Sequence, residues 1–289
     1  MTRVPEAEVL LGRGWWTGQC WEQRACLRPT DDSTEESLLQ QIEAMVPVER
    51  DSAVLASLVC SPAGDPLGLS KARELSMGDR ELLLLLLRRQ IFGNIMPCLL
   101  LCPACSERMD LQLKVDDLTV EAGAECQLRY EQTMEVDDKS FRVSFRLPTG
   151  GDVERALHAA PDAEGAAKEL ALSCIESVTR SGNDPASAVE VGPEAWPDSL
   201  LQEVSARMEK LDPQGEVRLQ LACPACGHDF DQSLDAGGYL VQELAARQRA
   251  KYQEVHQLAL AYHWSEAEIL RMGPRKRRLY LELLNADHE

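Results

Sequence analysis

The stretch Cys102-Pro103-Ala104-Cys105 recurs later in the chain as Cys223-Pro224-Ala225-Cys226. In each copy the two thiols lie three positions apart, and a tight turn between them directs both sulfur atoms the same way. Two such turns supply the four thiolates of a closed tetrahedral zinc site. We therefore expect Cys102, Cys105, Cys223 and Cys226 to bind one Zn2+ between them.

The residues around the two pairs favour such turns. Proline at the second position restricts φ, and Gly227 can take the positive φ that a turn of this kind often needs, whereas Ser106 is less suited to it. The long separation is no obstacle, because lengthening a loop from about 20 to about 120 residues adds only about 1.5 kcal/mol of closure entropy. Buried reduced thiols, an iron centre and a redox pair remain the alternatives.

The length, composition and charge of the chain limit the classes of protein to which it can belong. The 289 residues are enough for one elaborated domain or two, and the hydrophobic fraction of 44% is typical of soluble globular proteins. With 30 basic and 48 acidic residues the net charge is −18, which argues against a general phosphate-binding surface and disfavours nucleic acid as a partner.

No segment has the pattern of a secretory signal or a membrane span. Residues 1–16 contain acidic side chains, and the leucine run at 82–87 is far too short to cross a bilayer. We therefore expect a cytoplasmic protein, in which cysteines serve as metal ligands or buried thiols rather than disulfides. The six cysteines outside the two pairs are expected to be small buried hydrophobes, with Cys98 as a spare ligand: Cys20, Cys26, Cys60, Cys98, Cys126 and Cys174.

The chain divides into four expected regions. These are an N-terminal helical region at 1–70, a helix with the first zinc knuckle at 71–124, an α/β insertion at 125–215, and the second knuckle with C-terminal helices at 216–289. The fold class is α+β and mainly helical. A split zinc ribbon is interrupted by an insertion of a hairpin plus helices and is followed by a C-terminal helical arm.

Hydrophobic periodicity and capping residues predict the individual elements. Helices are expected at 34–46, 50–60, 76–93, 152 onward, 163–178, 198–211, 239–262, 265–272 and 275–284. Strands are expected on both sides of each knuckle, and a hairpin at 126–136 and 141–147 with a turn at 137–140. Three tryptophans, Trp15, Trp16 and Trp21, form either a local core or an anchor for a partner.

A basic run opens the last predicted helix. Arg275, Lys276, Arg277 and Arg278 form either a solvated face or a contact for an acidic partner surface. With Trp264 and Tyr280 nearby, these six residues are the candidate partner-binding surface.

Several motifs together resemble the baseplate hub and hub-assembly proteins of T-even-like contractile phage tails and of related bacterial contractile injection systems. The resemblance covers roughly residues 75–289. The motifs are Gly78-Asp79-Arg80 before the leucine-rich helix, the CPAC pair, Arg146-Leu147-Pro148-Thr149, Leu211-Asp212-Pro213, and the C-terminal stretch from Val255 to Leu281 with Tyr262-His263-Trp264-Ser265 and Arg277-Arg278-Leu279-Tyr280.

This resemblance implies a component or an assembly chaperone of a baseplate, with other baseplate or tail proteins as partners and a place in an assembled particle. An enzyme is disfavoured, because four thiolates leave no open position on a zinc ion and no phosphate loop, HExxH motif or Ser/His/Asp set is present. The alternative is a zinc-ribbon protein that binds nucleic acid or has a regulatory role.

Overall fold

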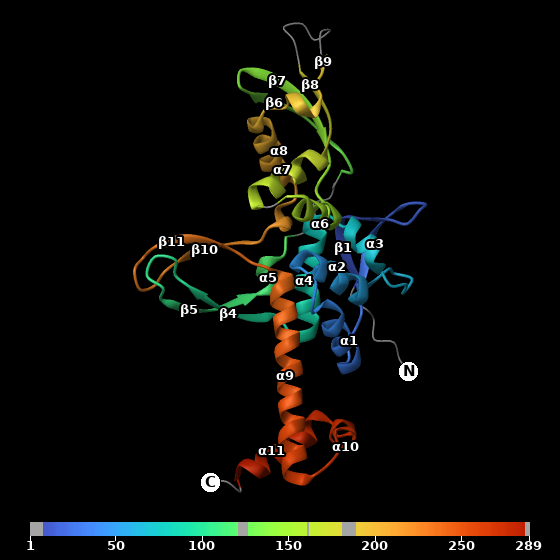
Figure 1. The fold of residues 1–289 in the computed structure, drawn as a ribbon, viewed down its shortest axis with the longest axis vertical. Helices are drawn as coiled ribbons and strands as arrows, with labels where there is room; N and C mark the ends of the chain where they lie inside the picture. Colours follow the sequence, from blue (N-terminus) through green and yellow to red (C-terminus); the bar gives the residue numbers. More distant parts are fainter. Residues whose placement is uncertain (1–7, 121–126, 161, 181–188, 287–289) are drawn as a thin grey trace.

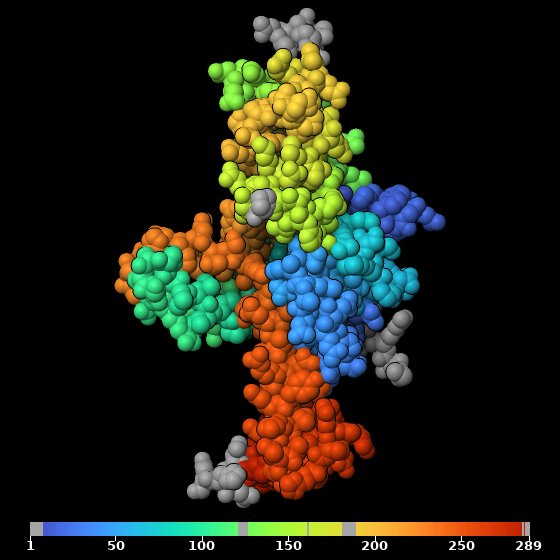
Figure 2. All heavy atoms as spheres, viewed as in Figure 1, coloured from blue at the N-terminus to red at the C-terminus, as the bar shows by residue number. Residues whose placement is uncertain are grey.

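The computed structural model describes residues 8–120, 127–160, 162–180 and 189–286. The molecule is elongated, with a central helical body, a sheet-containing unit at one end and a long helix that extends to the other end (Figure 1). Two β-hairpins leave the body together as a side arm, which stands clear of the rest of the surface (Figure 2).

The body begins with strands rather than helices. β1 (Glu8–Trp16), β2 (Trp21–Leu27) and β3 (Val59–Cys60) form one antiparallel sheet, so the expectation of a helical region at 1–70 is wrong for its first part. Gly14 takes a φ of 73° where the register of β1 shifts, and any Cβ there would overlap Glu22 O. As a result Trp15 is buried in the core, while Trp16 is 45% exposed and lies against Trp21.

Helices complete the body: α1 (Asp32–Ile42), α2 (Pro47–Leu58), α3 (Gly68–Glu74) and α4 (Met77–Phe92). The predicted boundaries of α4 are confirmed, since the Ser76 hydroxyl accepts the N–H of Asp79 and Gly93 ends the helix with a φ of 90°. All six leucines at 82–87 are buried. A helix with apolar side chains all round must be central, and α4 packs against α2, β1 and α9 (Ala236–Tyr262).

The unit at the far end is a four-stranded antiparallel meander of β6 (Tyr130–Val136), β7 (Lys139–Phe145), β8 (Ile175–Arg180) and β9 (Val189–Glu190). α7 (Ala163–Cys174) and α8 (Asp198–Leu211) bury their apolar residues against the sheet. α6 (Gly150–Ala159) lies between this unit and the body, and a 3-10 turn, η2 (Pro193–Ala195), precedes α8.

Two details of this unit differ from the expectation. The β6–β7 turn holds only Asp137 and Asp138, both with positive φ as in a type I′ turn, so Lys139 and Ser140 belong to β7. The helix predicted at 163–178 ends at Cys174, because the next residues pair with β7 as β8. The predicted start of the hairpin at Cys126 lies outside the described residues.

The hairpin arm consists of β4 (Ile95–Leu101) with β5 (Arg108–Lys114), and β10 (Arg218–Ala222) with β11 (Asp229–Ser233). The short helices α5 (Val115–Leu118) and η3 (Pro213–Gly215) join these hairpins to the body and to the sheet unit. The long helix α9 carries α10 (Glu266–Arg271) and α11 (Pro274–Ala286) at its far end, and the capping box predicted at Ser265 and Glu268 is confirmed. Within the described ranges, no helix is both long and apolar enough to span a bilayer.

Candidate metal centre

The two CPAC turns have the same backbone structure. Leu101 pairs with Arg108 and Ala222 pairs with Asp229, so each turn spans the same six positions. In the first turn the N–H of Cys102 donates to Glu107 O and the N–H of Ser106 donates to Cys102 O, both at 2.9 Å. In the second, the N–H of Cys223 donates to His228 O and the N–H of Gly227 donates to Cys223 O, at the same distance.

The fifth position of each turn has positive φ. Gly227 takes 70°, as the sequence predicts, and Ser106 takes 60° although it carries a side chain. This conformation turns the N–H of the fifth residue back toward the carbonyl of the first cysteine. Both sulfur atoms of a pair therefore lie on the same side of the turn.

The two turns bring all four sulfur atoms together. Cys102 Sγ lies 3.7 Å from Cys226 Sγ, Cys105 Sγ lies 3.7 Å from Cys223 Sγ, and all four lie within 4.8 Å of one another. A Zn–S bond of about 2.3 Å in a tetrahedron places two sulfur atoms about 3.8 Å apart. The four cysteines are therefore placed to bind one metal ion such as zinc.

The cluster is half covered. Cys102 and Cys223 are buried against Met109, Leu221 and Phe230, whereas Cys105 and Cys226 are exposed. His228 is exposed, but its ring stacks on the ring of Phe230, with the two ring centroids 6.2 Å apart. One side of the cluster thus packs on apolar side chains and the other faces solvent.

The thiols compete for protons. Burial works against ionisation of Cys102, but the N–H groups of Cys105 and Ala104 donate to its sulfur and lower the pKa of this thiol to about 6. For Cys105 the N–H of Glu107 lowers the pKa, and hydrogen bonds with the other three thiols outweigh it and raise the pKa to about 12. A bound cation would let all four sulfur atoms be thiolates together.

Of the other cysteines, those in the described part of the chain do not join the cluster. Cys98 is buried at the base of the arm, where burial raises the pKa of its thiol, and the group of possible metal ligands comprises the four CPAC cysteines without it. Cys26, Cys60 and Cys174 are buried, as expected for small hydrophobes, whereas Cys20 is exposed. Cys126 lies outside the described residues.

The candidate partner surface at the far end of α9 is only partly available. Trp264 stacks on Tyr262, and Tyr280 contacts both rings edge-on, so that Trp264 and Tyr280 are half-buried in a small core. Arg277 is 5% exposed; its Nε donates to Glu254 Oε2 at 3.1 Å and its guanidinium donates to Met272 O at 2.8 Å. Arg275, Lys276 and Arg278 are exposed. Arg277 therefore fastens α11 to α9 rather than facing a partner.

A second constellation, which the sequence analysis did not place, lies where α4 begins. The carboxylate of Asp79 accepts the N–H groups of Gly12, Arg13 and Gly14 at 2.7, 3.1 and 2.8 Å. The N–H of Gly78 donates to Asp212 at 2.8 Å. Thus β1 and the segment after α8 are both held by the first turn of α4.

Arg80 extends this junction into the core. It is 1% exposed and donates to Ser52 Oγ and to the carbonyls of Ala72 and Val48, at 3.0 to 3.1 Å. Its guanidinium also lies against Gly150, where a Cβ would come within 2.2 Å. The charged residues Asp79, Arg80 and Glu81 directly before a run of six leucines are the sequence feature that could have pointed to this joint.

Comparison with known protein families then identifies the class. The family model described as T4 bacteriophage base plate protein matches residues 30–236, more than half of the chain. The chain belongs to this family. The match contains both CPAC turns, Gly78-Asp79-Arg80 and Asp212, but not β1, and it begins well before residue 75. It ends before most of α9, so the C-terminal motifs quoted above lie outside it.

No curated protein and no solved structure matches the chain.

Proposed function

We propose that the chain is a zinc-stabilised component or assembly factor of a contractile, phage-tail-like baseplate, that it is not an enzyme, and that it acts through contacts with other baseplate proteins. Membership of the baseplate family supports the setting. The proposal that the metal is zinc rests on the spacing of 3.7 Å between sulfur atoms of different turns, which fits the edge of a ZnS4 tetrahedron.

The bound zinc would act as a structural crosslink, making the two hairpins a split zinc ribbon. The hairpins come from parts of the chain on either side of the sheet unit, and the small core at the arm's end contains only a few apolar side chains. An isolated two-stranded hairpin is only marginally stable in water, while a structural zinc in peptide models contributes roughly 10 kcal/mol or more. The metal would thereby fix the arm relative to the body.

The far end of α9 would supply a further contact. Arg275, Lys276 and Arg278 are exposed, and Lys276 Nζ lies 5.9 Å from the centre of the half-buried Tyr280 ring. Exposed cations on a chain of net charge −18 suit an acidic surface of a neighbouring protein. Nucleic acid is disfavoured, because Arg277 is used internally and the chain as a whole repels phosphates.

The test is baseplate assembly with ligand variants. Cys102→Ser and Cys226→Ser each remove one thiolate, and Cys20→Ser serves as the matched control because Cys20 is exposed and is not one of the four clustered cysteines. We expect the first two to lower stability and to abolish assembled particles in electron micrographs, while the control assembles normally. Native stability together with normal particles in either ligand variant would refute the proposal.

A further inference from the structure

The outer edge of β4 differs from the other edges of the hairpin arm. Each hairpin is a two-stranded sheet, so each of the four strands of the arm has one side that no strand of the described chain covers. The hydrogen bonds that close the hairpins show which residues face these open sides. The N–H of Val115 donates to Asn94 O, and the N–H of Cys102 donates to Glu107 O.

These two bonds fix the alternation along β4. In an antiparallel pair, hydrogen-bonded and non-hydrogen-bonded positions alternate. Asn94 and Cys102 face β5, so the N–H and C=O groups of Ile95, Leu99 and Leu101, and the carbonyl of Pro97, point away from it. Proline fits there, because an outward position needs no N–H for the ladder.

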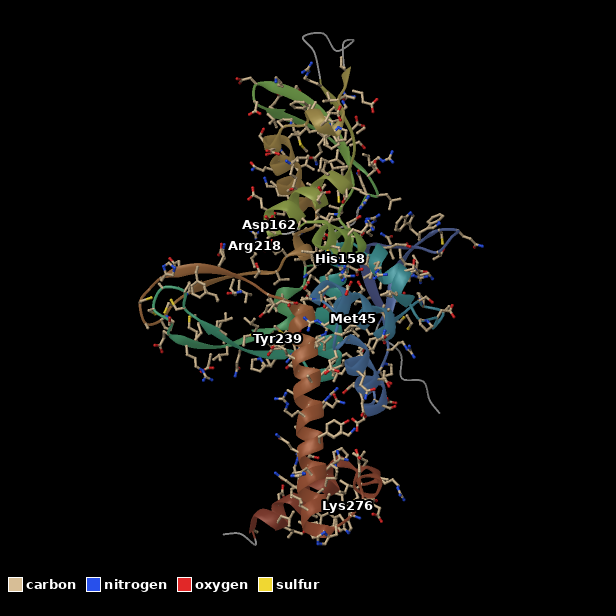
Figure 3. The ribbon with its side chains drawn as sticks, in the orientation of Figure 1. Met45, His158, Asp162, Arg218, Tyr239 and Lys276 are labelled. Atoms are coloured by element: carbon tan, nitrogen blue, oxygen red, sulfur yellow. The ribbon has the colours of Figure 1, made fainter. Side chains whose placement is uncertain are left out.

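Only the half of this edge near the body is covered. A guanidinium N–H of Arg88 donates to Ile95 O at 2.7 Å, and the Tyr239 hydroxyl donates to Pro97 O. Tyr239 lies at the base of the arm, where α9 begins (Figure 3). Within the described part of the chain, nothing hydrogen-bonds the outward groups of Leu99 and Leu101, whose residues are 51% and 63% exposed.

The residue types separate this edge from the other three. The outward positions are Arg108, Asp110, Gln112 and Lys114 on β5, Arg218, Gln220 and Ala222 on β10, and Asp229, Asp231 and Ser233 on β11. Each of those edges carries charged side chains, the usual protection against pairing with another strand. On β4 the same positions are Ile95, Pro97, Leu99 and Leu101, without a charge, and all four side chains are exposed.

We propose that the outer edge of β4 at Leu99–Leu101 binds an extended segment of another baseplate protein, which adds as a strand and places apolar side chains at alternate positions beside Leu99 and Leu101. Two donors and two acceptors are offered, and an added strand would satisfy all of them. The arm stands off from the body, so a strand can approach (Figure 2). That the partner is a baseplate protein rests on the proposed function.

A second copy of this chain fits the edge less well, because two chains of net charge −18 repel each other. Self-pairing is nevertheless an outcome that the experiment can detect.

The first experiment places lysines on the edge of the full chain. Leu99→Lys with Leu101→Lys is compared with Gln220→Lys with Ala222→Lys, which adds the same charge at outward positions of β10. Co-purification of each with assembled baseplates is measured, and circular dichroism and zinc content verify the fold. We expect the β4 variant to fall roughly ten-fold or more in the recovered fraction, with the β10 variant unchanged.

The second experiment separates backbone pairing from side-chain contact. Leu99→Ala removes the side chain and keeps the N–H, whereas Leu99→Pro also removes the outward N–H without breaking a bond to β5. We expect Leu99→Pro to be recovered with baseplates less than Leu99→Ala. Equal recovery of the two variants would overturn strand addition.

The other outcomes are distinct. If the wild-type chain and the β4 lysine variant associate equally with baseplates, the β4 edge is not the contact. Strand addition is then overturned, while the proposed baseplate function stands. If the wild-type chain does not associate, the proposed function fails with it. If the purified chain sediments as a dimer that the β4 lysines dissociate, a second copy occupies the edge and the inference is overturned.

Discussion

Ser106 and Gly227 occupy the same place in the two knuckles, and both have positive φ. This conformation costs a residue with a Cβ roughly 1–2 kcal/mol, whereas glycine accepts it. The space around Gly227 is open, so backbone conformation alone distinguishes the two positions.

Exchanging the two residue types should therefore have opposite effects. We expect Ser106→Gly to raise the free energy of unfolding by about 0.5 kcal/mol, since the more flexible unfolded chain offsets part of the gain, and Gly227→Ser to lower it by about 1 kcal/mol. Denaturant unfolding of both variants measures this. Two changes of the same sign would show that the turns are not equivalent.

Carboxylates gather at the start of α9. Burial raises the pKa of Asp51 to about 6 and that of Glu81 to about 8, with the opposing Arg80 charge only partly compensating. One oxygen of Glu81 is buried without a hydrogen-bond partner among the described residues. Because the folded state binds these protons more tightly than the unfolded chain does, stability is greatest below the ordinary carboxyl pKa and falls as the pH rises toward 8.

Glu81→Gln should remove much of this pH dependence. We expect an unfolding temperature like that of the wild type at pH 5, where Glu81 is protonated, and a higher one at pH 9, where the wild type contains a buried charge. Thermal unfolding at pH 5, 7 and 9 measures it, with exposed Glu282→Gln as the control. A stabilisation that is equal at all three pH values would contradict the assignment.

At the scale of elements, the sequence signals were strongest where local chemistry decides the structure. The cap at Ser76, the capping box at Ser265 and Glu268, the leucine run of α4 and the bounds of α8 follow from residues within one turn of the helix concerned. The two CPAC turns also follow from residues within each motif. Because the same tetrapeptide occurs twice, the sequence further predicts that the two turns meet at one site.

The elements that were missed depend on distant partners. β8 is a strand because residues 175–180 pair with β7, although the preceding residues have a helical pattern. β1 and β2 depend on each other and on the bond from Asp79 to the bend at Gly12–Gly14, which no local pattern reveals. Arg277 looked like part of a surface run until its bond to Glu254 placed it inside.

The structural order of both hairpins should depend on the bound metal. If zinc crosslinks them, a chelator should speed amide hydrogen exchange in 99–110 and 219–232, because little else orders the far end of the arm. Peptides from α4 are the internal control, since this helix is buried in the body core. Mass-spectrometric exchange before and after chelation gives the answer, and unchanged hairpins would show that they are ordered without metal.

At the scale of the whole molecule, the start of α4 joins the sheet unit to the body. Asp79 holds β1, Gly78 holds Asp212, and Arg80 lies between α2, α3 and the start of α6. Motifs that marked the family resemblance thus build an internal joint. Sequence alone could not distinguish this role from a partner surface, because charged residues serve both.

Gly150→Ala should loosen that joint. Its Cβ would lie 2.2 Å from the Arg80 guanidinium, which is buried and cannot move aside without losing its hydrogen bonds. We expect a loss of roughly 2–4 kcal/mol in the free energy of unfolding. Gly273→Ala, where nothing lies within 4 Å of the added Cβ, is the matched control. Denaturant titration compares them, and equal stability of the two variants would contradict the role of Gly150.

Metal analysis together with thiol titration on freshly purified protein would show directly whether the four cysteines bind zinc. We expect one zinc ion per chain and four thiols, those of Cys102, Cys105, Cys223 and Cys226, that react only after a chelator is added. A chain without metal, whose exposed Cys105 and Cys226 react at once with the thiol reagent, would contradict it.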